Sequence, residues 1–352
     1  MSRYFSEKYR SLVPYTPGEQ PTERKYIKLN TNESPFPPSE RAVAAAAEAA
    51  RVLQLYPDPT CGELTAAVAA QCGVQPDEVL LTNGSDEILN FAFMAFCDDR
   101  HPAVFADITY GFYQVFAQLN GVPYRTVPLK EDLSIDPADY SAAGGTLFIA
   151  NPNAPTGLAL SMEDVEGILK ANPDNVVVID EAYVDFGGQS CIPLIRKYDN
   201  LLVTQTFSKS RSMAGARLGF GVGCAALIQD LNTVKYSTNP YNINRMTMAA
   251  GLGTLADEAY TQANCATIVA TRQMTRAALC EMGFEVTDSR TNFLFARHPR
   301  IGGKALYTAL KENGILVRHF GQPRISDYVR ITIGSEAEMK TFIAAVKAIL
   351  EE

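Results

Sequence analysis

The chain has 352 residues, 47% of them hydrophobic and 20% charged, which is typical of a soluble globular protein long enough for one large and one smaller domain. Its formal net charge of −8 argues against nucleic acid or an anionic membrane as a partner, and the lack of any run of about 18 apolar residues argues against a membrane span. Seven scattered cysteines, three dispersed histidines and an N-terminal segment without an apolar stretch predict a cytoplasmic protein with neither disulfides nor a metal cluster.

The N-terminal part of the chain predicts an irregular arm followed by two alanine-rich helices. Three prolines within the first 30 residues disfavour regular structure there. The helices are expected at about 39–53 and at 62–72, the second ending at Gly73 as its C-cap. Between them lies the turn YPDP at 56–59.

The middle of the chain alternates short apolar runs with helical stretches such as SDEILNFAFMAF and SMEDVEGILKAN. Several runs are apolar at every residue, which is the pattern of parallel strands buried on both faces. The alternation predicts an α/β fold whose mostly parallel central sheet is flanked by helices, with ligands at the carboxyl ends of the strands. The expected strands are 78–82, 102–106, 145–150, 175–180, 200–206 and 217–223.

After residue 242 the pattern changes to one long helix, expected over about 243–282, followed by short strands and two more helices. This pattern predicts a second, smaller α+β domain. We therefore expect an N-terminal arm and linker over 1–45, a large domain over 46–242 and a small domain over 243–352.

Lys209 follows the expected strand at 200–206 in a setting that suits a phosphate group. A single lysine is usually a solvated surface residue, but this one comes directly after the hydroxyls of Thr206 and Ser208. Arg217 lies eight residues further on. Hydroxyls and an arginine can cradle a phosphate, and a lysine beside such a cradle suits a Schiff base to a phosphorylated aldehyde.

Asp180 stands where the expected strand at 175–180 ends, which is the ligand edge of a parallel sheet. A carboxylate there is costly to bury unless it meets a cation, and the pyridinium nitrogen of pyridoxal phosphate is such a cation. The pairing keeps the ring protonated, so that it draws electrons from the substrate Cα. Tyr183 can bring its hydroxyl to the phenolic oxygen of the ring. The simpler alternative is that Asp180 caps a turn.

Two further segments offer cofactor contacts, although each motif is common when taken alone. Gly84 and Ser85 open an amphipathic helix whose free N–H groups form a phosphate site, and Asp86 favours its first turn. Tyr110, after the strand at 102–106, can lie flat against a planar ring.

In order and spacing, these motifs resemble those of the fold-type-I, pyridoxal-phosphate-dependent aminotransferases over nearly the whole chain. Within that group the sequence is most similar to the histidinol-phosphate aminotransferase family. The markers are LNTNESP (29–35), YPDP (56–59), NGSDE (83–87), DEAYVDF (180–186), SKSRSMAGARLGF (208–220) and VRITIG (329–334).

The resemblance implies that Lys209 carries pyridoxal 5'-phosphate, that Asp180 pairs with the ring nitrogen and that Tyr110 stacks on the ring. It also implies a homodimer with shared active sites. It implies as well that Gly84, Ser85, Ser208 and Arg217 hold the phosphate and that Tyr56 reaches the cofactor phosphate of the neighbouring subunit. Besides these, we expect Asp86, Asn153, Tyr183 and Thr206 to bind the cofactor.

One position departs from the family pattern, which has Asn-Pro-Thr-Gly where this chain has Ala154 before Pro-Thr-Gly. The phenolic oxygen is then left to Asn153, to Tyr183 or to both. We expect Asn153, because its amide lies on a loop that two prolines stiffen.

The substrate end is expected around Arg330, which alternates with apolar residues in the strand DYVRITIG. An arginine central to an apolar strand usually meets an anion in a cleft, although a structural ion pair is the alternative. Arg318 can join it. In the resembled family these arginines bind the phosphate of the substrate, with Tyr15 and Asn32 nearby.

The implied reaction is reversible amino transfer between L-histidinol phosphate and 2-oxoglutarate in histidine biosynthesis. An aromatic amino-acid aminotransferase and a threonine-phosphate decarboxylase are the alternatives with similar motifs. A dinucleotide site is rejected: GVGCAA at 221–226 fits G-x-G-x-x-A, but YNINR at 241–245 lacks the acidic residue required about 20 positions on.

Overall fold

A seven-stranded sheet forms the centre of the computed structural model, which describes residues 2–351. Its strand order is β2-β8-β7-β6-β5-β3-β4, and only β8 runs antiparallel to its neighbours. The mostly parallel α/β sheet expected from the sequence is therefore confirmed. The strands are β2 Val79–Thr82, β3 Ala103–Ala106, β4 Tyr124–Val127, β5 Thr146–Ala150, β6 Val177–Asp180, β7 Leu201–Thr206 and β8 Gly219–Gly223.

The edge strand β4 was not expected, because three of its four residues are exposed and it contains no apolar run. The six expected strands are present because alternate residues of each face two different cores. In β6, Val177 and Ile179 pack into one core and Val178 into the other. Strands buried on both faces must be apolar throughout, which is why the sequence revealed them.

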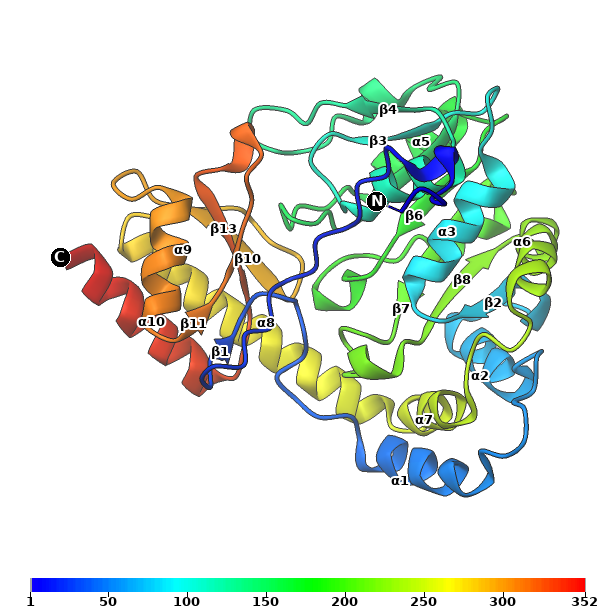
Figure 1. Ribbon diagram of the computed structural model, residues 1–352, viewed down its shortest axis with the longest axis horizontal. Helices are drawn as coiled ribbons and strands as arrows, with labels where there is room; N and C mark the ends of the chain where they lie inside the picture. Colours follow the sequence, from blue (N-terminus) through cyan, green and yellow to red (C-terminus); the bar gives the residue numbers. More distant parts are fainter. Residues whose placement is uncertain (1, 352) are drawn as a thin grey trace.

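Helices cover both faces of this sheet (Figure 1). On one face lie α3 Ser85–Phe96, α4 Phe112–Asn120 and α6 Ala225–Thr238. On the other lie α2 Gly62–Cys72, α5 Met162–Ala171 and α7 Arg245–Leu255, with α1 Glu40–Ala49 packed on α7. Short 3-10 turns occur at Glu7–Tyr9, Ala50–Val52, Pro76–Glu78, Pro137–Tyr140, Val184–Phe186, Ile192–Arg196, Ala214–Ala216 and Pro323–Ile325.

The prediction of one long helix over 243–282 is wrong in one respect, because the structure has two helices there. After α7 the chain leaves helical geometry at Asp257, where φ is −130° and ψ is 48°, and α8 Glu258–Glu281 begins. A short polar side chain such as aspartate favours helix boundaries over helix interiors. The first expected helix likewise ends early, at Ala49.

A second sheet of four antiparallel strands forms the C-terminal part, in the order β12-β13-β10-β9. Its core packs against α8 and two later helices, and α8 runs from α7 towards this part of the molecule (Figure 1). The division into domains at 45/46 and 242/243 stays a prediction. The elements are β9 Glu285–Val286, β10 Phe293–Arg297, β12 Arg318–His319, β13 Tyr328–Thr332, α9 Gly303–Glu312 and α10 Glu336–Glu351.

The segment expected as an irregular arm contains one strand that ties it to the C-terminal part. β1 Ile27–Lys28 pairs in parallel with β11 Ile315–Leu316, and the N-terminal arm leads to it past the central sheet (Figure 1). Two residues are too few for a periodic signal, so this pairing was not visible in the sequence. Among the described residues, no helix has both the length and the hydropathy needed to cross a membrane.

Candidate active site

A cavity opens at the carboxyl ends of the central strands, where parallel sheets place their ligands. Ala150, Asp180 and Thr206 are the last residues of β5, β6 and β7, so the topology itself brings them to one edge. Most residues expected to bind a cofactor line this cavity. Its lining is Ser85, Asp86, Tyr110, Ala150, Pro152, Ala154, Asp180, Ala182, Tyr183, Thr206, Ser208, Lys209 and Arg217.

Asp180 is 4% exposed and forms no ion pair with any described residue. The hydroxyl of Tyr113 donates to its Oδ2 at 2.9 Å, and the backbone N–H of Ala182 donates to its Oδ1 at 3.2 Å. Burial raises the pKa of this carboxyl to about 6, against these two donors. A buried carboxylate that lines the cavity and has no ion-pair partner fits a protonated ring nitrogen.

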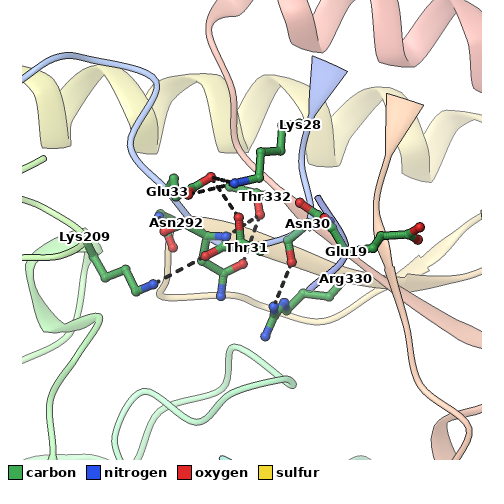
Figure 2. A network of polar contacts seen from close by, with 10 residues as sticks. Glu19, Lys28, Asn30, Thr31, Glu33, Lys209, Asn292, Arg330 and Thr332 are labelled. Atoms are coloured by element: carbon green, nitrogen blue, oxygen red, sulfur yellow. Dashed lines mark hydrogen bonds and ion pairs between the residues drawn. The ribbon is translucent and has the colours of Figure 1, made fainter. Parts of the chain in front are cut away.

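Lys209 enters the same cavity from the loop after β7. Its Nζ donates to the carbonyl of Thr31 at 3.4 Å (Figure 2). The same atom lies 5.8 Å from the centre of the Tyr183 ring. No carboxylate among residues 2–351 lies within ion-pair distance of it. The amine is therefore held by one long, weak contact, which leaves it available to react with an aldehyde.

The residues expected to hold a phosphate converge where α3 begins against the turn before β8. Gly84 has φ of +78°, and a Cβ there would lie 2.5 Å from Nη2 of Arg217. That guanidinium pairs with Asp86 at 2.9 Å and donates to Oγ of Ser208 at 3.4 Å. A Cβ at Gly219 would collide with the backbone N of Ser85. Glycine at both positions thus lets the helix N-terminus, an arginine and hydroxyls converge.

Tyr110 lines the cavity with its hydroxyl donating to Oδ1 of Asp86 at 2.6 Å. Burial raises the pKa of this phenol well above its ordinary value, so the group stays neutral. Its ring meets that of Tyr113 edge-on, with centroids 5.7 Å apart and planes at 88°. A neutral aromatic ring held this way is suited to cover one face of a planar cofactor.

Asn153 is hydrogen-bonded to other residues of the chain and does not line the cavity. Its Nδ2 donates to the carbonyl of Ile108 at 3.0 Å and to Oγ1 of Thr156 at 3.1 Å, and its Oδ1 accepts from Oγ1 of Thr109 at 2.8 Å. Both ends of the amide are committed to shaping the loop, and it is Ala154 that lines the cavity. These bonds do not favour the expected ring-oxygen contact of Asn153, which stays a prediction, and of the two expected residues it is Tyr183 that lines the cavity.

Tyr183 is held by the loop that carries the N-terminal asparagine motif. Nδ2 of Asn32 donates to its hydroxyl at 2.9 Å. Asn32 itself has φ of +57°, a left-handed conformation that asparagine tolerates, and its Oδ1 accepts from Oγ1 of Thr332 at 3.0 Å. Asn32 thus connects the strand of Arg330 to the cavity.

Two consecutive carbonyls of this loop accept from the arginine and from the lysine, as Figure 2 shows. The carbonyl of Asn30 accepts from Nη2 of Arg330 at 3.2 Å, and that of Thr31 accepts from Lys209. The next carbonyl, that of Asn32, accepts from Nδ2 of Asn292 at 3.0 Å. Lys209, Asn292 and Arg330, which are far apart in the sequence, therefore all donate to the same short segment, 30–32.

Arg330 has no acidic partner among the described residues. The alternative interpretation, that Arg330 forms a structural ion pair, is therefore wrong. Its guanidinium lies between the rings of Phe293 and Phe320, at 5.2 and 5.6 Å, and its Nε lacks a hydrogen-bond partner. Burial lowers the pKa of this arginine. A partly buried arginine with an unused donor points to an anion from outside the chain.

Arg318 serves the N-terminal arm. It donates to the carbonyls of Pro17 at 3.2 Å and Thr16 at 3.1 Å. These contacts place Tyr15, whose ring stacks on Phe112 at 4.2 Å and lies 6.4 Å from that of Tyr110. Burial raises the pKa of Tyr15, and the charge of Arg330 opposes the rise. Arg318 therefore uses two of its N–H groups to hold the arm, whereas the Nε of Arg330 has no partner among the described residues.

Tyr56 lies outside the cavity and is 76% exposed. Its ring stacks on Tyr241 at 4.7 Å, and Arg245 donates to its carbonyl at 2.7 Å. Its expected role in a neighbouring subunit stays a prediction. The sequence analysis did not single out Tyr113. Its position three residues after Tyr110 could have indicated that the two side chains lie close together.

The chain matches the family model described as aminotransferase class I and II over residues 24–346. It is 51% identical to histidinol-phosphate aminotransferase 2 of Dechloromonas aromatica, over 99% of each chain. Its fold resembles that of the Sinorhizobium meliloti histidinol-phosphate aminotransferase in complex with pyridoxal-5'-phosphate, with a TM-score of 0.90, 24% identity and coverage of 100% and 98%. L-threonine-O-3-phosphate decarboxylase of Porphyromonas gingivalis shares the fold alone, with a TM-score of 0.80, 22% identity and coverage of 93% and 100%. The chain belongs to the class I and II aminotransferases and, among them, to the histidinol-phosphate aminotransferase family.

Proposed function

We propose that this protein binds pyridoxal 5'-phosphate and transfers the amino group of L-histidinol phosphate to 2-oxoglutarate, giving imidazole acetol phosphate and L-glutamate in histidine biosynthesis. The observation that carries the proposal is a single cavity in which Lys209, the buried Asp180 and the Gly84–Arg217 cradle face one another. The full-length identity of 51% supports the same substrate.

The cofactor, when bound, supplies an electron sink for the Cα electrons of the substrate. Asp180 would pair with its ring nitrogen, Tyr110 would cover one ring face and Tyr183 would donate to the phenolic oxygen. Lys209 attaches the cofactor and then holds and moves the Cα proton as a general base. The groups proposed to hold the phosphate are Gly84, Ser85, Thr206, Ser208 and Arg217, with Asp86 orienting the arginine.

Arg330 is the proposed anion site for both substrates, since the phosphate of one and a carboxylate of the other must meet a cation. The Phe293 and Phe320 rings around it exclude water, which strengthens the attraction. The charge of Arg330 acts on the pKa of Tyr15, and Asn32 lies two residues after Asn30, whose carbonyl accepts from Arg330. An aromatic amino acid would use the same arginine for its carboxylate, so this geometry admits the alternative and a measurement must decide.

Replacing Arg330 with alanine should lower kcat/KM for histidinol phosphate several hundred-fold, because truncating one side of a desolvated charge pair costs about 2–5 kcal/mol. Arg297→Ala, on the neighbouring strand β10 but exposed and paired with Glu285, should have little effect. The purified wild-type protein should prefer histidinol phosphate to phenylalanine, tyrosine and threonine phosphate. A kcat/KM ratio near one against the aromatic amino acids would move the assignment to an aromatic aminotransferase, and release of CO₂ from threonine phosphate would move it to the decarboxylase.

We also propose a homodimer in the cytoplasm, with Tyr56 reaching the cofactor phosphate of its partner. Tyr56 is surrounded by other exposed apolar side chains, which a second subunit would cover. They include Val52, Leu53, Leu55 and Tyr241. The cysteines within residues 2–351 are free thiols, as a reducing compartment requires.

Mixing a Lys209→Ala chain with a Tyr56→Phe chain should restore activity that neither has alone. Subunit exchange creates hybrid dimers in which one site has both its lysine and its partner's tyrosine. A Lys209→Ala chain mixed with the Lys209→Ala/Tyr56→Phe double variant should stay inactive and serves as the control. Absence of complementation after demonstrated exchange would argue against a shared site.

A further inference from the structure

Tyr113, on α4, has an environment that its position in the core does not by itself explain. It is completely buried, and its ring packs between Phe105 and Phe148 with centroids 5.8 Å from each. Its hydroxyl has one partner, Oδ2 of Asp180, at 2.9 Å. A buried hydroxyl is costly unless it is bonded, so phenylalanine would be the simpler residue unless the bond to Asp180 has a use.

The bond constrains the carboxylate in two ways. With the N–H of Ala182 on Oδ1 and the Tyr113 hydroxyl on Oδ2, each oxygen has one donor and the plane of the group is held. A donor to a carboxylate also favours its charged form, which is the form that a protonated ring nitrogen needs. The edge of the same tyrosine ring meets Tyr110, so one side chain supports both groups proposed to contact the ring.

We propose that Tyr113 is a positioning residue for the cofactor ring: it holds Asp180 charged and oriented towards the ring nitrogen, and it fixes Tyr110 against the ring face. The inference rests on the proposed function, because the ring nitrogen is the partner that Asp180 lacks within the chain.

Several charges act on Asp180 besides this hydroxyl. Burial and, to a smaller extent, the charge of Asp86 on α3 raise its pKa, Lys209 in the loop after β7 lowers it, and the net pKa is about 6. The bonds from Tyr113 and Ala182 also lower the pKa. Removing the Tyr113 hydroxyl therefore raises the pH at which Asp180 of the free protein takes up a proton. Since the proton must leave before the ring can pair, cofactor affinity is lost at a higher pH.

The test is the pH dependence of pyridoxal phosphate binding in Tyr113→Phe, which keeps the ring and removes the hydroxyl. The dissociation constant, measured by absorbance titration, should be about tenfold higher than wild type near pH 5, the factor lost with one hydrogen bond to a charged group. Near pH 8, where Asp180 is charged with or without the bond, the difference should be much smaller. The pH below which cofactor affinity falls, the acid limb of the profile, should be about one pH unit higher in Tyr113→Phe than in wild type.

Tyr140→Phe is the matched control. Tyr140 is also fully buried, at 1% exposed, but its hydroxyl has no hydrogen-bond partner among the described residues. Its removal should leave the pH profile unchanged. In an Asp180→Asn background, where the charge is gone, Tyr113→Phe should add little to the loss of affinity.

The outcomes separate the two proposals. A wild-type protein that fails to bind pyridoxal phosphate overturns the proposed function. A wild-type protein that binds it, with a Tyr113→Phe profile that matches wild type, overturns only the role of Tyr113. An equal shift in Tyr140→Phe, or a full effect that persists in Asp180→Asn, would mean that core packing is being measured and would also overturn it.

Discussion

Replacing Lys209 with alanine should abolish amino transfer, with kcat lower by roughly 10⁴-fold or more. The change removes the covalent attachment of the cofactor and also a general base, and loss of a general base alone costs about 10²–10⁴-fold. Steady-state kinetics with histidinol phosphate and 2-oxoglutarate measures the effect. Lys347→Ala, at an exposed position on α10, should retain wild-type activity.

The same assignment can be tested without turnover. Borohydride treatment of the wild-type protein loaded with pyridoxal phosphate should leave a pyridoxyl group on the peptide that contains Lys209, identified by mass spectrometry. Lys209 is the only lysine that lines the cavity beside the cradle, so no other peptide should carry it. A pyridoxyl group on a different lysine would remove the basis of the whole site assignment.

Replacing Asp180 with asparagine should lower kcat by about 10²–10⁴-fold, the range for loss of a tuned acid–base partner. The amide keeps the shape of the side chain but cannot keep the ring nitrogen protonated, so the ring loses its ability to draw electrons. Cofactor binding should weaken less than turnover, because the phosphate cradle is untouched. Near-wild-type turnover would make Asp180 a turn residue.

Glu181→Gln is a matched control for this substitution. Glu181 is the next residue and equally buried, but its carboxylate accepts from Ser190 at 2.7 Å and Gln205 at 2.8 Å and does not line the cavity. Its loss should affect stability far more than kcat. A decrease in kcat comparable to that of Asp180→Asn would show that any buried charge in this loop matters, whatever it faces.

Cofactor binding by the wild-type protein should weaken as the pH falls through about 6. Burial raises the pKa of Asp180 to about that value, so below it the carboxyl of the free protein is protonated and must lose its proton to pair with the ring. Above this pH the carboxylate is already charged and affinity should be constant. Asp180→Asn should lose this acid limb, which equilibrium titration over the pH range can establish.

The class of fold, and most of the residues that line the cavity, could be predicted from the sequence alone. The central strands were readable because a strand buried on both faces must be apolar at every position. Lys209, Asp180 and the Gly84–Ser85 helix start were readable because strand ends and helix starts are local features, and the topology of a parallel sheet then brings them to one edge. Their proposed roles stay predictions.

Only the tertiary structure shows which polar groups already have hydrogen-bond partners within the chain. Asn153 and Arg318 carry chemistry suited to a ligand, but the amide of Asn153 donates to Ile108 and Thr156, and two N–H groups of Arg318 donate to carbonyls of the N-terminal arm. Conversely, the Nε of Arg330 has no partner. A motif records the groups a residue offers, whereas long-range packing decides what they meet. For that reason the bond from Tyr113 to Asp180, across 67 positions, could be found only in the folded chain.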